Sequence, residues 1–257
     1  DDPGAWGSQN EQDTRPLGPL TEVPMLEPAT PAEGRAMIRW AFDYSESLQT
    51  VVILRITRTY STSTEDLPTF EAPAEKPSKP ADREPMSWIS ALRTTQANHT
   101  QVHEKLAQAT TDFSELAFNR VNGSGKKGII ASGVVHAKLM DALKGADTSA
   151  LSILKLSSLY PLPKDLIASF LSQCEEILVL EEVDPYVEDG IKAIGYDTGN
   201  TPPIIGKRTG HIASVSELFR WQMQKALDNF LPGFSPETRY TEENWEDEKP
   251  FRKNHCA

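Results

Sequence analysis

The sequence predicts an α/β protein with a doubly wound, mostly parallel sheet over residues 126–232. In this range short apolar segments alternate with amphipathic helical segments, which is typical of strand–helix–strand units around a parallel sheet. An earlier run, TVVILRITR (50–58), is almost continuously apolar. Such a run is typical of a strand covered on both faces. Parallel-sheet character is therefore present in both halves of the chain.

The first predicted helix follows a long loop. Residues 1–28 are expected to be loop-like because glycine and proline recur throughout them. A helix then begins in TPAEGRAMIRWAFDYSES. Thr30 can cap this helix, Pro31 suits its first position, and Glu33 stands where a capping box requires an acidic side chain.

Residues 1–60 do not complete a sheet by themselves. They carry one predicted helix and the one buried-type strand at 50–58. A central parallel strand needs hydrogen-bonded neighbours on both sides. These neighbours come from further sequence, from another chain, or from the second half of this chain. We favour further sequence and expect residues 1–60 to pack poorly without it.

The rest of the chain divides by composition. Residues 61–87 are rich in Pro, Ser and charge without an apolar period, and are predicted to be a linker. A helical connector is expected over 88–125, with its helix at about 88–116, and an acidic flexible tail over 233–257. In between, strands are predicted at 127–132, 151–158, 176–182 and 203–207, and helices at 134–145, 163–174, 185–195 and 214–231.

Composition excludes several classes of function. The formal net charge of −11 argues against general affinity for nucleic acid or an anionic membrane surface. No apolar run approaches the roughly 20 residues of a membrane span. Cys174 and Cys256 form neither a disulfide framework nor a zinc motif, so a reducing, cytoplasmic setting is expected.

Two motifs are assigned structural roles. GSGKKG (123–128) matches a dinucleotide-binding glycine pattern, but it precedes a predicted strand instead of following one, which favours a turn. His99 and His103 lie four apart on a predicted helix. The pattern lacks the Glu and the third ligand of a metalloprotease site, so we interpret it as a solvated helix face and predict no metal site.

Carboxylates follow the strand within LVLEEVDPYVEDGIKAI (178–194). Ligands of open parallel sheets gather at the carboxyl ends of strands, so Glu181 and Glu182 are candidates for a strand-end site. Asp184 is interpreted as the N-cap of the next helix, with Pro185 at its first position.

Several stretches together resemble one family, in order from residue 1 to about 230. They are DDPGAWGSQNEQDTR, VPMLEP, VVILRITRT, LAFNRV, GIIASGVVHAKLMDAL, LKLSSLYPLP, ILVLEEVDPYVEDGIK and IIGKRTGHIASVSEL. This combination is similar to the large (alpha) subunit of indolepyruvate:ferredoxin oxidoreductase.

The resemblance implies an enzyme that uses thiamin diphosphate, Mg²⁺ and 4Fe–4S clusters. It would convert aryl-2-oxo acids and CoA to acyl-CoA, pass electrons to ferredoxin, and form a hetero-oligomer with a beta subunit. Residues 1–60 would be the C-terminal part of a pyrimidine-binding thiamin diphosphate domain, and residues 126–232 a transketolase C-terminal-like domain. Two alternatives stay open: a non-catalytic assembly module, and the same chemistry on pyruvate or branched 2-oxo acids.

The resemblance also limits the site. In the family the ylid-generating Glu lies upstream of the DDP motif, and the Mg-diphosphate motif and cluster cysteines lie downstream. No catalytic residue or metal ligand is therefore predicted here, and the chain alone is expected to be inactive and to bind no cofactor. Where this chain has Ala5-Trp6-Gly7, the family commonly has a His and small polar residues, so we hypothesise that Trp6 lines the aryl pocket. The candidates for contact with cofactor or substrate are Trp6, Ser8, Gln9, Asn10, Gln12 and Asp13.

Overall fold

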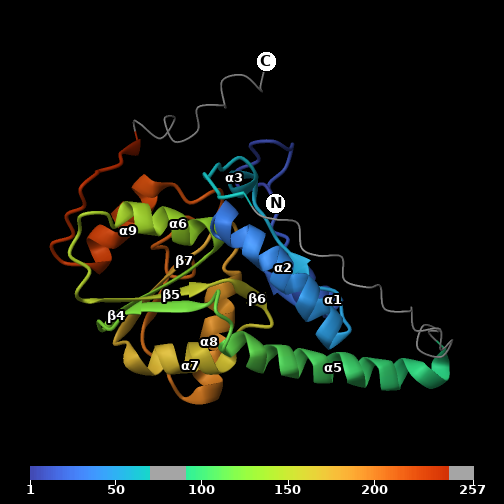
Figure 1. The fold of residues 1–257 in the computed structure, drawn as a ribbon. Helices are drawn as coiled ribbons and strands as arrows, with labels where there is room; N and C mark the ends of the chain where they lie inside the picture. Colours follow the sequence, from blue (N-terminus) through green and yellow to red (C-terminus); the bar gives the residue numbers. More distant parts are fainter. Residues whose placement is uncertain (70–90, 243–257) are drawn as a thin grey trace.

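The structure, a computed structural model, describes residues 1–69 and 91–242. Much of the predicted linker (61–87) and of the predicted tail (233–257) lies outside the described residues. Within the described part, a five-stranded sheet, a three-stranded sheet and surrounding helices make up the fold (Figure 1). The predicted α/β class is confirmed. In these two ranges, no helix combines the length and the apolar character that crossing a membrane requires.

The five-stranded sheet has the order β3-β5-β4-β7-β8. Strands β4, β5, β7 and β8 are parallel to one another, and β3 pairs antiparallel to β5 at one edge. The mostly parallel sheet is thus confirmed, whereas β3 was expected to be part of a helical connector. The strands are β3 (Arg120–Gly123), β4 (Lys127–Ser132), β5 (Leu151–Leu156), β7 (Glu176–Leu180) and β8 (Ile204–Ile205).

Helices cover both faces of this sheet, as the doubly wound prediction requires. Helices α6 (Gly133–Ala142) and α9 (Arg220–Phe230) lie on one face, and α7 (Lys164–Gln173) and α8 (Tyr186–Thr198) on the other (Figure 1). Successive side chains of a strand point to opposite faces. Ile129 accordingly packs in the core beside α6 and α9, and Ile130 in the core beside α7 and α8.

The glycine-rich motif forms the turn between β3 and β4, as predicted. Gly123 has a φ of +81°, which favours glycine, and the Gly125 N–H donates to the Leu151 carbonyl at 3.0 Å. A Cβ at Gly125 would lie 1.9 Å from the carbonyl carbon of Ala150. Glycine is therefore required here by close backbone approach.

The three-stranded sheet joins the two halves of the chain. Strand β1 (Met25–Leu26) pairs parallel with β2 (Ile53–Leu54) and antiparallel with β6 (Ser158–Tyr160). Both residues of β1 are fully buried. The expectation concerned the strand at 50–58, which we expected to find its neighbours in further sequence. Among the described residues its neighbour is β1, a strand of the first segment that was not predicted, and β6 of the second half pairs with the other side of β1.

The predicted strand at 50–58 is much shorter in the structure. Only Ile53–Leu54 forms a strand, and both side chains are half-buried. Val51 is 65% exposed and Ile56 is 43% exposed. Among the described residues β2 has β1 as its only strand neighbour, so its far edge is unpaired, while Ile53 and Leu54 pack at the margins of two core clusters.

Three further helices belong to the first half. Helix α1 (Leu17–Thr21) lies within the region expected to be loop, and α3 (Arg58–Ser61) follows β2. Helix α2 (Pro31–Leu48) begins as predicted, with Thr30 at the N-cap accepting from the Glu33 N–H at 3.3 Å. The carboxylate of Glu33 accepts from the Ala29 N–H at 2.7 Å, so the capping arrangement extends one residue further back.

The long connector helix is α5 (Leu92–Ser114), close to the prediction. Its C-terminal half packs against α2, where Phe113 and Ala109 are fully buried beside Trp40. The Tyr44 hydroxyl donates to Asp112 at 2.8 Å. The N-terminal half of α5 extends away from the large sheet (Figure 1).

The last helix begins later than predicted. Helix α9 starts at Arg220, and residues 214–219 are not helical. The Leu218 N–H donates to Glu182 at 3.2 Å and the Leu218 carbonyl accepts from Lys138 at 3.0 Å. These contacts with Glu182, which follows β7, and with Lys138 of α6 take the place of helical hydrogen bonds. They join residues far apart in the sequence, so local sequence patterns do not predict them.

Candidate functional site

The carboxyl end of β7 holds two buried carboxylates. Glu181, 1% exposed, accepts from the N–H groups of Val187 and Glu188 at 2.9 Å each, and so caps α8. The prediction that Asp184 caps this helix is wrong. The N-cap position is Pro185, whose side chain has no acceptor, and Glu181 reaches the first turn from the strand end. Burial raises the pKa of Glu181 despite these donors.

Arg15 attaches the opening loop to this strand end. Its guanidinium donates to Glu181 at 2.6 Å and to the carbonyls of Glu182 and Asp184 at 2.7 Å each. It also donates to both carboxylate oxygens of Asp13, at 2.5 to 3.1 Å. Burial raises the pKa of Asp13, but the Arg15 guanidinium outweighs this and holds that pKa below its usual value. Arg15, 2% exposed, thus pairs with two carboxylates in one buried network.

Glu182 belongs to a second buried network. Lys138 of α6 donates to Glu182 at 3.0 Å and to Glu217 at 2.6 Å. All three side chains are at most 6% exposed. Burial lowers the pKa of Lys138, but the two carboxylates outweigh it and raise that pKa above its ordinary value. Both strand-end carboxylates therefore have buried partners inside the protein.

The opening loop is folded around a carboxylate. Asp2 accepts from the N–H groups of Trp6, Gly7 and Ser8, at 3.0, 2.5 and 2.8 Å. Burial raises the pKa of Asp2, but these three hydrogen bonds outweigh it and lower that pKa below its usual value. The ring of Trp6 meets that of Phe219 edge to face, 6.0 Å between centroids. The loop therefore has a defined conformation against the second half of the chain.

A third ion network closes the base of the loop. Arg55, which follows β2, donates to the carboxylate of Asp1 at 2.8 Å and forms an ion pair with Glu27. The other oxygen of Asp1 accepts from the Thr14 N–H at 3.1 Å. The two ends of the loop are consequently held together by one side chain.

The predicted loop residues fall into two groups. Asp13 is tied to Glu181 through Arg15, and Trp6 is half-buried against Phe219. Four polar residues are exposed at the loop tip: Ser8, Gln9, Asn10 and Gln12. The structure brings together Asp13 and Glu181 but places these four in solvent, so no single pocket gathers the whole predicted set.

The sequence did not reveal the basic residues that pair with the carboxylates at the end of β7 and at the base of the opening loop. Arg15 and Lys138 each bridge two acidic groups, and Arg55 does the same at the loop base. A lone basic residue in a loop or helix carries no local signal of such a role. The available signal was the pair Glu181-Glu182, because two carboxylates after a buried strand require positive partners.

A cleft of about 360 Å³ lies beside the second network, between the start of α2 and helices α6 and α9. Four of its charged residues are paired with one another: Lys138 with Glu217, and Arg220 with Asp141 at 3.0 Å. The fifth, Glu65, accepts from the Ala32 N–H at 2.8 Å. A ligand that binds one of the four paired groups would have to displace its partner. The polar lining includes Thr30, Thr59, Lys138, Asp141, Glu217 and Arg220.

Comparison with known proteins shows that the chain is similar in sequence to subunits of oxidoreductases. No family description matches it. The particular relatives are the indolepyruvate oxidoreductase subunits IorA. That of Thermococcus kodakarensis is 34% identical over 238 residues, which cover 90% of this chain and 36% of the relative. That of Archaeoglobus fulgidus is 33% identical over 242 residues, covering 93% of this chain and 38% of the relative. The resemblance to this subunit is confirmed, and the chain spans just over a third of the relatives' length.

Comparison with solved structures finds two that are similar to parts of this chain, each at 14% identity. A protein titled split gene transketolase, inactive beta4 tetramer, gives a TM-score of 0.44 and matches 82% of this chain and 57% of that one. The 2-oxoglutarate:ferredoxin oxidoreductase from Magnetococcus marinus gives 0.48 and matches 72% of this chain and 39% of that one.

Proposed function

We propose that this chain is a segment of the large subunit of a thiamin diphosphate-dependent, ferredoxin-linked oxidoreductase. Its reaction would be the oxidative decarboxylation of aryl-2-oxo acids of the indolepyruvate type to acyl-CoA, with a beta subunit and ferredoxin as partners. The observation that carries the proposal is the 34% identity to an IorA subunit over 90% of the chain. The match supports a role within that larger enzyme.

The described residues do not fit a complete cofactor site. Thiamin diphosphate supplies the carbanion chemistry of decarboxylation when bound, and it is held through Mg²⁺. The buried carboxylates of Asp2, Asp13, Glu181 and Glu182 are each bonded to N–H groups or cations of this chain. This supports a cofactor site whose Mg²⁺ ligands come from other parts of the enzyme. We propose that cofactor binding needs the rest of the enzyme.

The part we assign to this chain is to present the opening loop. The Asp2 hydrogen bonds and the Arg15 network fix the loop, and this supports a role as a pre-ordered contact surface. The exposed tip residues Ser8, Gln9 and Asn10 then contact cofactor or substrate held by other parts of the enzyme. Trp6, beside the tip, would border the aryl group.

The experiment uses the complete enzyme, with the large subunit that contains this segment and its beta subunit. CoA-dependent reduction of ferredoxin or viologen is measured with indolepyruvate, phenylpyruvate, pyruvate and a branched 2-oxo acid. We expect the highest kcat/KM for an aryl substrate. A higher value for pyruvate would contradict the substrate class, and no turnover with any 2-oxo acid would favour an assembly role. For the 257-residue chain alone, calorimetry should show no thiamin diphosphate binding. Micromolar, Mg²⁺-dependent binding would contradict this.

A further inference from the structure

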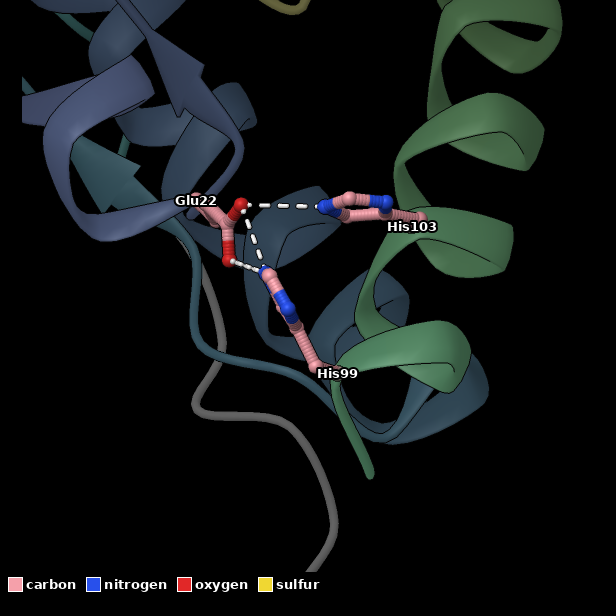
Figure 2. Close-up of side chains that lie close together, drawn as sticks. All are labelled: Glu22, His99 and His103. Carbon is pink, nitrogen blue, oxygen red and sulfur yellow. Dashed lines mark hydrogen bonds and ion pairs between the residues drawn. The ribbon is translucent and has the colours of Figure 1, made fainter. Parts of the chain in front are cut away.

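Three side chains from distant parts of the sequence converge at one point on the surface: Glu22, His99 and His103 (Figure 2). The Nε2 atom of His99 lies 2.9 and 3.0 Å from the two carboxylate oxygens of Glu22. The Nε2 atom of His103 lies 3.1 Å from one of them. One ligand-type atom from each residue lies within 4.8 Å of the others.

The backbone holds these groups in place from both sides. Glu22 ends α1 in the left-handed region, with φ 55° and ψ 40°, and its N–H donates to the Gly18 carbonyl. His99 and His103 are four apart on α5, so their side chains leave the same face of that helix. Their rings meet edge to face, 4.4 Å between centroids. The C-terminal part of α5 is anchored on α2 through the buried Phe113, and the two imidazoles of the N-terminal half face Glu22 (Figure 2).

The separations approach those of metal ligands. Zinc bound tetrahedrally at about 2.0–2.1 Å by imidazole nitrogen and carboxylate oxygen separates its ligand atoms by about 3.3–3.4 Å. The N···O distances of 2.9–3.1 Å are a few tenths of an ångström shorter. A small outward rotation of the side chains is enough to admit an ion.

The stability that a surface ion pair provides is too small to account for this arrangement. The side chains of His99, His103 and Glu22 are 57%, 60% and 33% exposed. Exposed pairs contribute at most about 1 kcal/mol to stability. Two imidazoles and a carboxylate are the set that Zn²⁺ and its neighbours Co²⁺, Ni²⁺ and Cu²⁺ prefer, whereas Mg²⁺ and Ca²⁺ prefer oxygen alone.

We propose that Glu22, His99 and His103 bind a divalent transition metal ion, with Zn²⁺ the best match, and that water completes the coordination. The sequence predicted no metal site because the histidine pair lacked a third ligand, and in the fold Glu22 lies beside both histidines. Bound metal links α1 to α5 across 77 residues of chain and fixes the projecting half of α5. This proposal does not depend on the proposed function.

The test is metal binding to the purified full chain. Titration calorimetry with Zn²⁺, and visible absorption with Co²⁺, should show one strong site per chain. His99→Ala, His103→Ala and Glu22→Gln should each weaken binding at least tenfold. The matched control is His211→Ala, because His211 is also exposed and its ring nitrogen Nδ1 lies 2.8 Å from the Thr209 hydroxyl. This substitution should leave the affinity unchanged.

Competing ligands are removed in a second background. His255→Ala with Cys256→Ser eliminates the other soft ligands near the C-terminus, and the strong site should persist in it. Two results would overturn the proposal: no saturable binding of Zn²⁺ below millimolar concentration, or equal affinity in the chain that lacks all three ligands. Circular dichroism of each variant checks folding, which these exposed substitutions should leave intact.

Discussion

Replacing Arg15 should be among the most damaging single changes in this chain. The variant Arg15→Met keeps much of the aliphatic stem and removes the charge. It leaves Glu181 and Asp13, whose side chains are 1% and 3% exposed, without their cation. Breaking a buried ion pair in this way costs about 3–5 kcal/mol. For a domain of this size each kcal/mol lowers Tm by about 2–4 °C, so Tm should fall by about 6–20 °C.

The assay is urea and thermal unfolding of the full chain, followed by circular dichroism. The matched control is Arg208→Met, because Arg208 also pairs with a carboxylate, Asp189, at 2.6 Å, but the two side chains are 57% and 49% exposed. Exposed pairs are worth about 1 kcal/mol or less. A loss for Arg15→Met no larger than that for Arg208→Met would refute the view that burial makes this network important.

The other predictions concern pH, sterics and substrate preference. Burial, with Lys155 adding to it, lowers the pKa of His136 to about 4. As the pH falls, His136 is protonated in the unfolded chain before it is protonated in the folded chain, so the free energy of unfolding should fall by up to about 3 kcal/mol between pH 6.5 and 4. The variant His136→Gln should lack this pH dependence of unfolding, and an unchanged pH dependence would contradict the assignment. Gly125→Ala should lose more than about 1 kcal/mol in urea unfolding, because its Cβ would meet the backbone of Ala150; wild-type stability would show that the turn can move. In the complete enzyme, Trp6→Ala should lower kcat/KM for arylpyruvates more than for pyruvate, and equal ratios across both substrate classes would exclude a role in the aryl pocket.

Local sequence patterns predicted the large sheet and its helices, where both faces of the strands are buried. The alternation of Ile129 and Ile130 between the two faces follows directly from an apolar strand, and the helices around it follow from their periodicity. The run at 50–58 has the same apolar content, yet it forms only two strand residues. Apolar content reports that a segment prefers burial, but not which neighbours are available to cover it.

The site depended on contacts between residues far apart in sequence. The pattern Asp184-Pro185 suggested a helix cap, but the carboxylate of Glu181 occupies the free N–H groups from the strand end. The spacing of His99 and His103 was visible, whereas Glu22 lies 77 residues away and has no motif around it. Local rules describe which groups seek partners, and only the tertiary fold decides which partners they meet.

The two sheets are parts of one continuous strand path. Strand β5 ends at Leu156 and β6 begins at Ser158, so a single residue separates the large sheet from the small one. The side-chain amide of Asn119 spans this step, accepting from the Ser157 N–H at 2.7 Å and donating to the Ser158 hydroxyl at 2.8 Å. Separating the proposed units 1–60 and 126–232 would remove the β6 neighbour of β1. Either unit expressed alone should therefore leave one strand of the small sheet without its neighbour.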